Sequence, residues 1–283
     1  MTTNRSRSLR RIWRHVVLIA VAILMLYPVL WMFVASLRPD EEIFRSGGIS
    51  LTGLSFDNYI EGWSALKHPF THYLVNSLVI TVGAIVGNLI SCSMAAYAFA
   101  RLKFRANKVF FAMMLITIML PVHVLLVPQY VLFSEVGWIN TPLPLIVPKL
   151  LATDAFFVFL MVQFIRGLPR ELDEAATIDG AGPVRIFIQI VLPLTVPALA
   201  TTAIFTFIWT WNDFLGPLIF LTDSDAYTVQ LALRSFIDSS GGGGGSSWGA
   251  MFAMSVVSLL PIFVIFLFGQ RYLVRGIATT GGK

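Results

Sequence analysis

The feature that most constrains the fold is a set of long segments without a charged residue: 15–37, 68–100, 109–134, 186–212 and 239–270. Each reaches or exceeds the roughly 20 apolar residues that a helix needs to cross a bilayer. These runs are apolar on every face, whereas surface elements of a soluble protein alternate apolar and polar positions. The sequence, with 57% hydrophobic and 12% charged residues, therefore predicts an all-α, multi-spanning membrane protein.

A further apolar segment, 146–166, is interrupted by Lys149 and Asp154 near one end. The chain begins and ends with basic segments, and basic segments share one side of a membrane only when the number of crossings is even. We therefore predict six membrane helices in a single domain over residues 1–283. Their expected bounds are about 14–36, 73–100, 109–133, 146–166, 193–221 and 250–271.

The positions of Lys and Arg predict the orientation, because cationic loops stay on the cytoplasmic side. Fifteen of the twenty cations fall before residue 15, in 101–108, in 166–192 and after residue 270. Both termini are therefore expected in the cytoplasm, and the loops 37–72, 134–145 and 222–249 outside it. No small-residue cleavage site follows the first run, so that run is expected to remain as a helix. The formal net charge of +5 reflects this asymmetry and implies no nucleic-acid partner.

Several kinds of chemistry find no support in the sequence. No G-x-x-x-x-G-K-[ST] motif is present, so any ATP must be bound by a partner. His68 and His72 have helical spacing, but Pro69 disfavours a helix through them and no Glu or Cys lies nearby to complete a metal site. Cys92 is the single cysteine, which excludes a disulfide within the chain. No metal site and no bound cofactor are expected.

A carboxylate deep in a membrane helix costs about 3 kcal/mol, so it needs a function or a partner. Asp213 is the main candidate, and together with Trp211 and Asn212 it offers a carboxylate, an aromatic plane and an amide. This is the chemistry that sugar hydroxyls and ring faces favour, and the three residues form a candidate substrate pathway. The alternative is that Asp213 caps or braces neighbouring helices.

Other segments suggest packing and docking. Gly83, Gly87, Ser91 and Ala95 recur every four residues and predict a close helix contact, within a bundle or a dimer. The acidic and aromatic loop 37–72 could dock an extracytoplasmic partner. The stretch "SSGGGGGSSWG", with glycines at 241–245, is typical of a slack surface connector.

The segment 167–192 is unusually charged for so apolar a chain. Pro169 suits the first turn of a short helix, and three acidic residues follow near its positive dipole end. Leu172, Ala175, Ala176 and Asp179 share one face at helical spacing. Gly180 is expected to stop the helix in a left-handed conformation, and Gly182 precedes a second break. We therefore predict a short helix that lies across the cytoplasmic surface and fits a groove of a partner.

This segment also carries a resemblance to a known family. Glu174-Ala175-Ala176, three residues, Gly180, nine residues, Ile190, one residue and Leu192-Pro193 match the "EAA" signature of membrane subunits of binding-protein-dependent ATP-binding-cassette importers. Further stretches, among them "NSLVIT", "FIWTWNDFLGPLIFL" and "GQRYLVRGI", resemble the carbohydrate-uptake permeases, in particular the shorter permease of maltose-type transporters. The similarity covers about residues 15–277.

The resemblance implies a non-enzymatic translocation subunit in a bacterial inner membrane. It implies a second related permease, two ATPase subunits that use ATP and Mg, and an extracytoplasmic binding protein as partners. The residues that would couple the chain to the ATPase are Glu174, Ala175, Ala176, Asp179, Gly180 and Gly182. The tail "GIATTGGK" departs from the family pattern, so its contact with the ATPase is not implied.

The cargo stays open at this point. A sugar fits best, and a glycerol phosphoester or polyamine permease of the same fold is an alternative. A phosphoester carrier should show cations facing its cavity, and the charge-free runs contain none. From a different class, a secondary carrier or channel that works without an ATPase is the other alternative.

Overall fold

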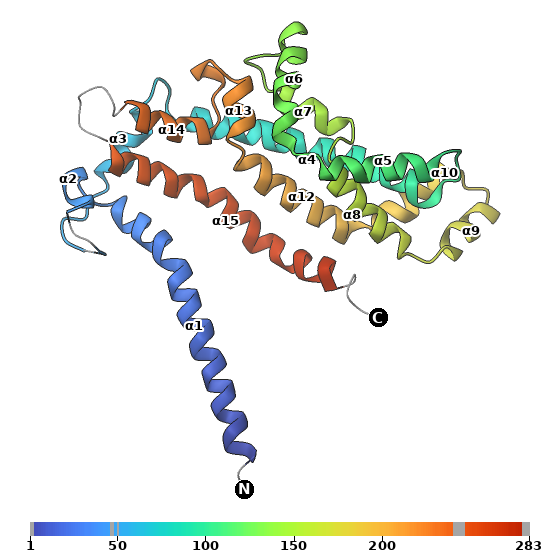
Figure 1. Cartoon of the computed structure of the whole chain (residues 1–283), viewed down its shortest axis with the longest axis horizontal. Coiled ribbons are helices and arrows are strands. Elements are labelled where there is room, and N and C mark those ends of the chain that lie inside the picture. Colours follow the sequence, from blue (N-terminus) through green and yellow to red (C-terminus); the bar gives the residue numbers. More distant parts are fainter. Residues whose placement is uncertain (1–2, 46–47, 50, 240–246, 279–283) are drawn as a thin grey trace. The chain divides into compact units, whose positions relative to one another are not determined.

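The computed structural model describes residues 3–45, 48–49, 51–239 and 247–278, which form helices and connecting turns without a β-strand (Figure 1). The predicted connector 241–245 and the tail 279–283 lie outside the described residues. Internal contacts divide the chain into a smaller unit, 1–70 with 233–259, and a larger unit, 71–232 with 260–283. The single domain predicted from the sequence thus contains two compact units.

Four helical segments are long and apolar enough to cross a membrane: Trp13–Ala35, Phe70–Arg101, Leu143–Arg166 and Trp248–Gln270. Two bent pairs of helices can each add one span. Asn107–Met119 and His123–Glu135 meet at 104°, and Pro183–Leu194 and Val196–Trp211 meet at 75°. The described residues therefore contain four to six candidate spans, and the predicted number of six is the upper end of that range.

The smaller unit contains α1 (Thr3–Ala35), α2 (Asp40–Ile43), α3 (Asp57–Ser64) and parts of α14 (Val229–Ser239) and α15 (Trp248–Ala278). The side chain of Asp40 accepts a hydrogen bond of 2.6 Å from the backbone N–H of Gly249. Asn58 donates to the backbone oxygens of Ser36 and Arg38, at 3.0 and 2.7 Å. The loop after α1 is therefore tied both to α3 and to the start of α15.

The core of the larger unit lies between α4 (Phe70–Arg101), α8 (Ala155–Arg166) and α12 (Val196–Trp211). α5 (Asn107–Met119) packs on α8, where the guanidinium of Arg166 lies 4.8 Å from the ring centre of Phe111. The residues buried in this core are apolar and come mainly from α4 and α8: Cys92, Ala96, Tyr97, Ala100, Phe157, Val158, Met161, Val162, Ile165, Ile186, Val191 and Ala198.

The stripe of small residues on α4 is filled by the chain's own α7 (Leu143–Leu150). A methyl group added to Gly83 would lie 2.8 Å from the side chain of Ile146, and one added to Gly87 would lie 3.1 Å from the backbone of Lys149. Ser91 donates a hydrogen bond of 2.6 Å to the backbone oxygen of Lys149. The close contact predicted from the sequence is therefore a seam within the bundle.

Three segments predicted as continuous helices, 109–133, 146–166 and 193–221, are divided into shorter helices in the structure. The segment 109–133 divides into α5 and α6 (Val122–Glu135) because Leu120 precedes a proline and takes an extended conformation, with φ −76° and ψ 127°. The segment 193–221 divides into α11 (Leu192–Leu194), α12 and α13 (Leu215–Phe220). The predicted 146–166 helix is likewise two helices, α7 and α8, on either side of residues 151–154.

Candidate functional site

The charged segment forms α9 (Glu171–Ile178), followed by α10 (Pro183–Ile186) and a π-helical turn, Phe187–Val191. Gly180 has a φ of +79°, as predicted for a left-handed stop. Its N–H bonds to the Thr177 oxygen at 3.0 Å, and the Ala181 N–H bonds to the Ala176 oxygen at 2.9 Å. These two bonds form a Schellman motif, which satisfies carbonyl groups at the end of the helix. Gly182 has an extended backbone and caps α10.

α9 exposes most of its side chains. Ile178 is 86% exposed and Leu172 40% exposed, which is unusual for side chains of this size. Glu174, Ala175 and Asp179 are exposed as well. Ala176 instead packs against the core of the larger unit. The two alanines that the sequence places on one contact face are therefore divided, since Ala175 is presented outward and Ala176 holds the helix to its own chain.

An ion pair joins α9 to the end of α4. Arg101, the last residue of α4, has a side chain only 5% exposed, and its Nε lies 3.1 Å from Oδ2 of Asp173. A second nitrogen of the same guanidinium donates to the Leu168 backbone oxygen at 2.8 Å. The hydroxyl of Tyr97, one turn earlier on α4, donates to the Pro183 oxygen at 3.1 Å. The segment 167–192 is thus attached to α4 on both sides of Gly180.

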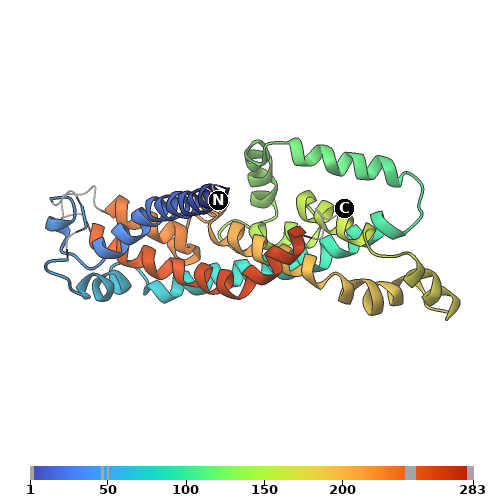
Figure 2. The same ribbon diagram turned by 90° about the horizontal axis from the view of Figure 1, so that it is seen from below.

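Figures 1 and 2 show α9 at the end of the larger unit where α4 also ends. The sequence alone does not predict this attachment, because Arg101 there indicates only orientation and Asp173 only a charge near a helix terminus. The signal in the sequence is the charge itself, because Arg and Asp side chains are rarely buried beside an apolar core without a charged partner.

The candidate pathway residues Trp211, Asn212 and Asp213 lie at the end of α12. The ring of Trp211 is 2% exposed and stacks on Phe207 with centroids 5.4 Å apart, so it presents no open face to a solute. Asn212 donates to the Ile208 oxygen at 2.8 Å, and Asp213 accepts from the Gly216 N–H at 3.2 Å. Asp213 therefore caps α13, which is the alternative role that the sequence suggested.

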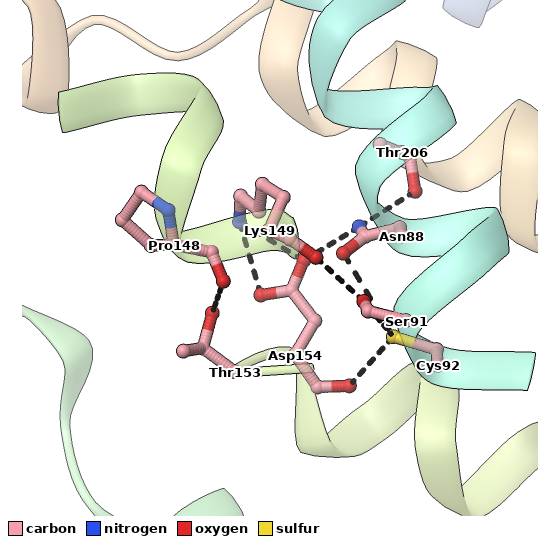
Figure 3. Close-up of polar contacts among 8 residues, drawn as sticks. All are labelled: Asn88, Ser91, Cys92, Pro148, Lys149, Thr153, Asp154 and Thr206. Carbon is pink, nitrogen blue, oxygen red and sulfur yellow. Dashed lines mark hydrogen bonds and ion pairs between the residues drawn. The ribbon is translucent and has the colours of Figure 1, made fainter. Parts of the chain in front are cut away.

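A cluster of polar residues that the sequence did not identify lies between α4, α7, α8 and α12 (Figure 3). Nζ of Lys149 lies 3.0 and 2.9 Å from the two carboxylate oxygens of Asp154. Asn88, fully buried on α4, donates to Oδ2 of Asp154 at 2.7 Å and to Thr206 Oγ1 at 3.1 Å. We call Asn88, Lys149, Asp154 and Thr206 the Lys149 cluster.

The signal for this cluster was present in the sequence as two opposite charges that interrupt the 146–166 segment. Lys149 is in the last turn of α7 and Asp154 directly precedes α8, so the break between these helices brings the two side chains together. Lys149 lies inside the candidate span Leu143–Arg166, the predicted span that the sequence shows to be interrupted by charges.

Among the described residues, no group of three or more His, Cys, Asp or Glu side chains is arranged to hold a metal ion. His72, considered above for its spacing, has its Nε2 2.7 Å from the Asp225 backbone oxygen, which places it in a loop contact of the larger unit.

The helical fold, with four to six candidate spans among the described residues, is that of a multi-spanning membrane protein with one exposed, anchored surface helix, α9. Residues 87–279 match the family model described as "Binding-protein-dependent transport system inner membrane component", and the chain belongs to this family. It is therefore a permease subunit of an inner membrane and not an enzyme, as predicted.

Relatives match over nearly the whole chain. The arabinooligosaccharides transport permease AraQ of Halalkalibacterium halodurans is 34% identical, over 93% of both chains. The sn-glycerol-3-phosphate transport permease UgpE of Pectobacterium atrosepticum is 34% identical, over 94% of this chain and 95% of the relative. The diacetylchitobiose uptake permease NgcG of Streptomyces coelicolor is 31% identical, over 91% and 84%.

A solved structure of a bacterial importer of the acidic polysaccharide alginate has the same fold. It gives a TM-score of 0.82 at 22% identity and covers 95% of this chain and 98% of the solved chain. A chain of the MetNI methionine transporter gives a TM-score of 0.51 over 73% of this chain. These likenesses show the fold and carry no statement about cargo.

Proposed function

We propose that this chain is the translocation subunit of an ATP-driven importer that moves a sugar into the cytoplasm by alternating access. The observation that carries the proposal is α9, which exposes Leu172, Glu174, Ala175 and Ile178 while Asp173 fixes it to α4 through Arg101. A surface helix attached in this way transmits the movement of a soluble partner directly to a membrane helix.

The partner at α9 is an ATPase subunit, which binds the ATP and Mg that this chain does not bind. The membrane topology that fits this role has six spans, with both termini and α9 in the cytoplasm. A second related permease forms the translocation pathway together with this chain, and two ATPase subunits hydrolyse the ATP, as in the family that the sequence resembles.

An extracytoplasmic binding protein delivers the solute to the segment 37–72. Three large apolar side chains of that segment support this docking role, because Leu51, Phe56 and Ile60 are each 70% or more exposed. Exposed apolar side chains that gather in one segment commonly mark a protein interface.

A sugar suits the chain better than a glycerol phosphoester, although relatives of both kinds have similar identity. A phosphoester requires an excess of positive charge along its route, and Lys149, the cation in the interior of the candidate span Leu143–Arg166, is neutralised by Asp154. Sugar-type relatives, AraQ and NgcG by name, support the same assignment.

Reconstitution tests the function. Vesicles would hold the chain with the second permease, the ATPase and the binding protein encoded by neighbouring genes. We expect uptake of labelled arabinooligosaccharide only with ATP and binding protein present, and weaker uptake of sn-glycerol 3-phosphate. Uptake by the chain without an ATPase would support the secondary carrier or channel and overturn the importer.

A further inference from the structure

The Lys149 cluster lies at the depth of the membrane interior. Asn88 is 13 residues before Arg101, the cytoplasmic end of α4 in the proposed topology, and a helix rises 1.5 Å per residue. Asn88 is therefore about 20 Å from that end, within a hydrocarbon core about 30 Å thick. Asp154 bonds to Asn88 and Lys149 pairs with Asp154, so both charged side chains share this depth.

The charged pair is held rigidly but is not enclosed. Asn88 is fully buried and fixes Oδ2 of Asp154, while the absence of a side chain at Gly87 lets the backbone of Lys149 approach α4. The side chains of Lys149 and Asp154 nevertheless remain 30% and 24% exposed. Charged groups facing lipid at this depth cost roughly 3 kcal/mol each, so their open sides are expected to meet water or protein.

The pair retains hydrogen-bonding capacity on its open side. An ammonium group has three donors, and among the described residues Lys149 donates two hydrogen bonds, one to each carboxylate oxygen of Asp154. A carboxylate has about four acceptor positions, and Asp154 uses three, two with Lys149 and one with Asn88. A donor and an acceptor therefore stand side by side, and neighbouring hydroxyl groups of a sugar can bond to both, since a hydroxyl donates and accepts.

The charge of the cluster also restricts what it can bind. Asp154 neutralises Lys149, because both of its carboxylate oxygens lie within 3.0 Å of the Lys149 ammonium nitrogen. This arrangement leaves no excess positive charge for an anionic solute.

We propose that Lys149 and Asp154 form a hydroxyl-binding site on a hydrated solute pathway, and that Asp154 excludes anionic solutes by neutralising Lys149. The site rests on the importer function proposed above and specifies where in this subunit a neutral sugar is bound.

Water access is the first test. Cys92→Ser removes the chain's single cysteine, and Lys149→Cys or Asp154→Cys is then introduced and assembled with the other subunits in vesicles. We expect a charged methanethiosulfonate reagent to label either cysteine at least tenfold faster than Ile90→Cys. Ile90 is the matched control because it lies on α4 and is 52% exposed but apolar. Labelling of both new cysteines no faster than the control would overturn the pathway.

Selectivity is the second test and uses a conservative variant. Asp154→Asn keeps the shape but leaves the Lys149 ammonium without its counter-ion. We expect the ratio of sn-glycerol 3-phosphate uptake to arabinooligosaccharide uptake to rise tenfold or more. Asp238→Asn is the control, because Asp238 forms an exposed ion pair with Arg234 at 3.2 Å in the smaller unit. An unchanged ratio in Asp154→Asn would overturn the role of Asp154.

The importer function is measured in the same vesicles by ATP-dependent uptake in the Cys92→Ser parent. If the parent takes up solute but residues 149 and 154 are not labelled, the proposed site is wrong and the importer stands. If the parent shows no dependence on ATP, the importer itself is wrong, whatever the labelling.

Discussion

Gly87 shows how much of the site depends on a missing side chain. A Cβ at this position would lie 3.1 Å from the backbone of both Lys149 and Leu150, closer than most such contacts in proteins. The backbone cannot turn aside as a flexible side chain would. α7 therefore approaches α4 closely enough for Ser91 to bond to the Lys149 oxygen, and this contact fixes where the Lys149 side chain begins.

Replacing Gly87 by Val should force α7 away from α4. Overpacking of this kind costs about 1–3 kcal/mol, so we expect a lower unfolding temperature of the purified complex in detergent. Gly48→Val is the control, because nothing lies within 4 Å of a Cβ at Gly48. Equal unfolding temperatures for the two variants would show that the α4–α7 contact is looser than described.

Gly180 matters for a different physical reason. Nothing lies within 4 Å of a Cβ there, so a side chain meets no steric obstacle, but the φ of +79° strains any β-branched residue. We expect Gly180→Val to lose ATPase co-purification and transport while still inserting in the membrane, and Gly180→Asn to lose less because Asn tolerates this conformation. Full coupling in Gly180→Val, measured as solute transported per ATP hydrolysed, would contradict the role of this turn.

At the scale of elements, α9 is a short helix that depends on others for its position. Eight residues are too few for a stable isolated helix in water. Its position comes from the ion pair of Asp173 with Arg101, from the packing of Ala176 and from the Tyr97 bond to the Pro183 oxygen. α9 should therefore move with α4 rather than independently.

A double-mutant cycle on Arg101→Ala and Asp173→Ala tests this attachment. We expect each single variant to lower the solute transported per ATP hydrolysed, and the double variant to lose less than the sum, with a coupling energy of about 0.5–3 kcal/mol in ATPase binding. Arg185→Ala is the control, because Arg185 is exposed and bonds to Gln189 on its own helical stretch. Strictly additive losses would mean that the pair does not hold α9.

The sequence could predict part of α9 and part of the pathway. The acidic first turn, the left-handed Gly180 and the exposure of Glu174 and Asp179 follow from local rules, because each depends on neighbours within a few residues. The burial of Trp211 and the contact between Asp154 and Asn88 do not, because the partners lie on segments remote in the sequence.

At the scale of the whole molecule, the orientation follows from the distribution of charge. Cations in 101–108 and in 166–192 are expected to hold those loops in the cytoplasm. We predict that green fluorescent protein fused after Lys283 is fluorescent, and that alkaline phosphatase inserted within 222–249 is active. An active phosphatase fused after Lys283 would place the C-terminus outside and contradict the predicted orientation.

The sequence by itself determined that the chain is helical and crosses a membrane, because long apolar runs satisfy their backbone hydrogen bonds in lipid only within helices. It also determined the location of α9 and of its stop at Gly180, because local spacing sets a short helix and its end. Only the tertiary structure decided which polar groups meet. The break between α7 and α8 turns Lys149 toward Asp154, and Asp154 in turn accepts a hydrogen bond from Asn88. The glycine at position 87 lets the backbone of Lys149 approach α4. Contacts between distant helices depend on shape and packing, which a linear pattern of residue types does not encode.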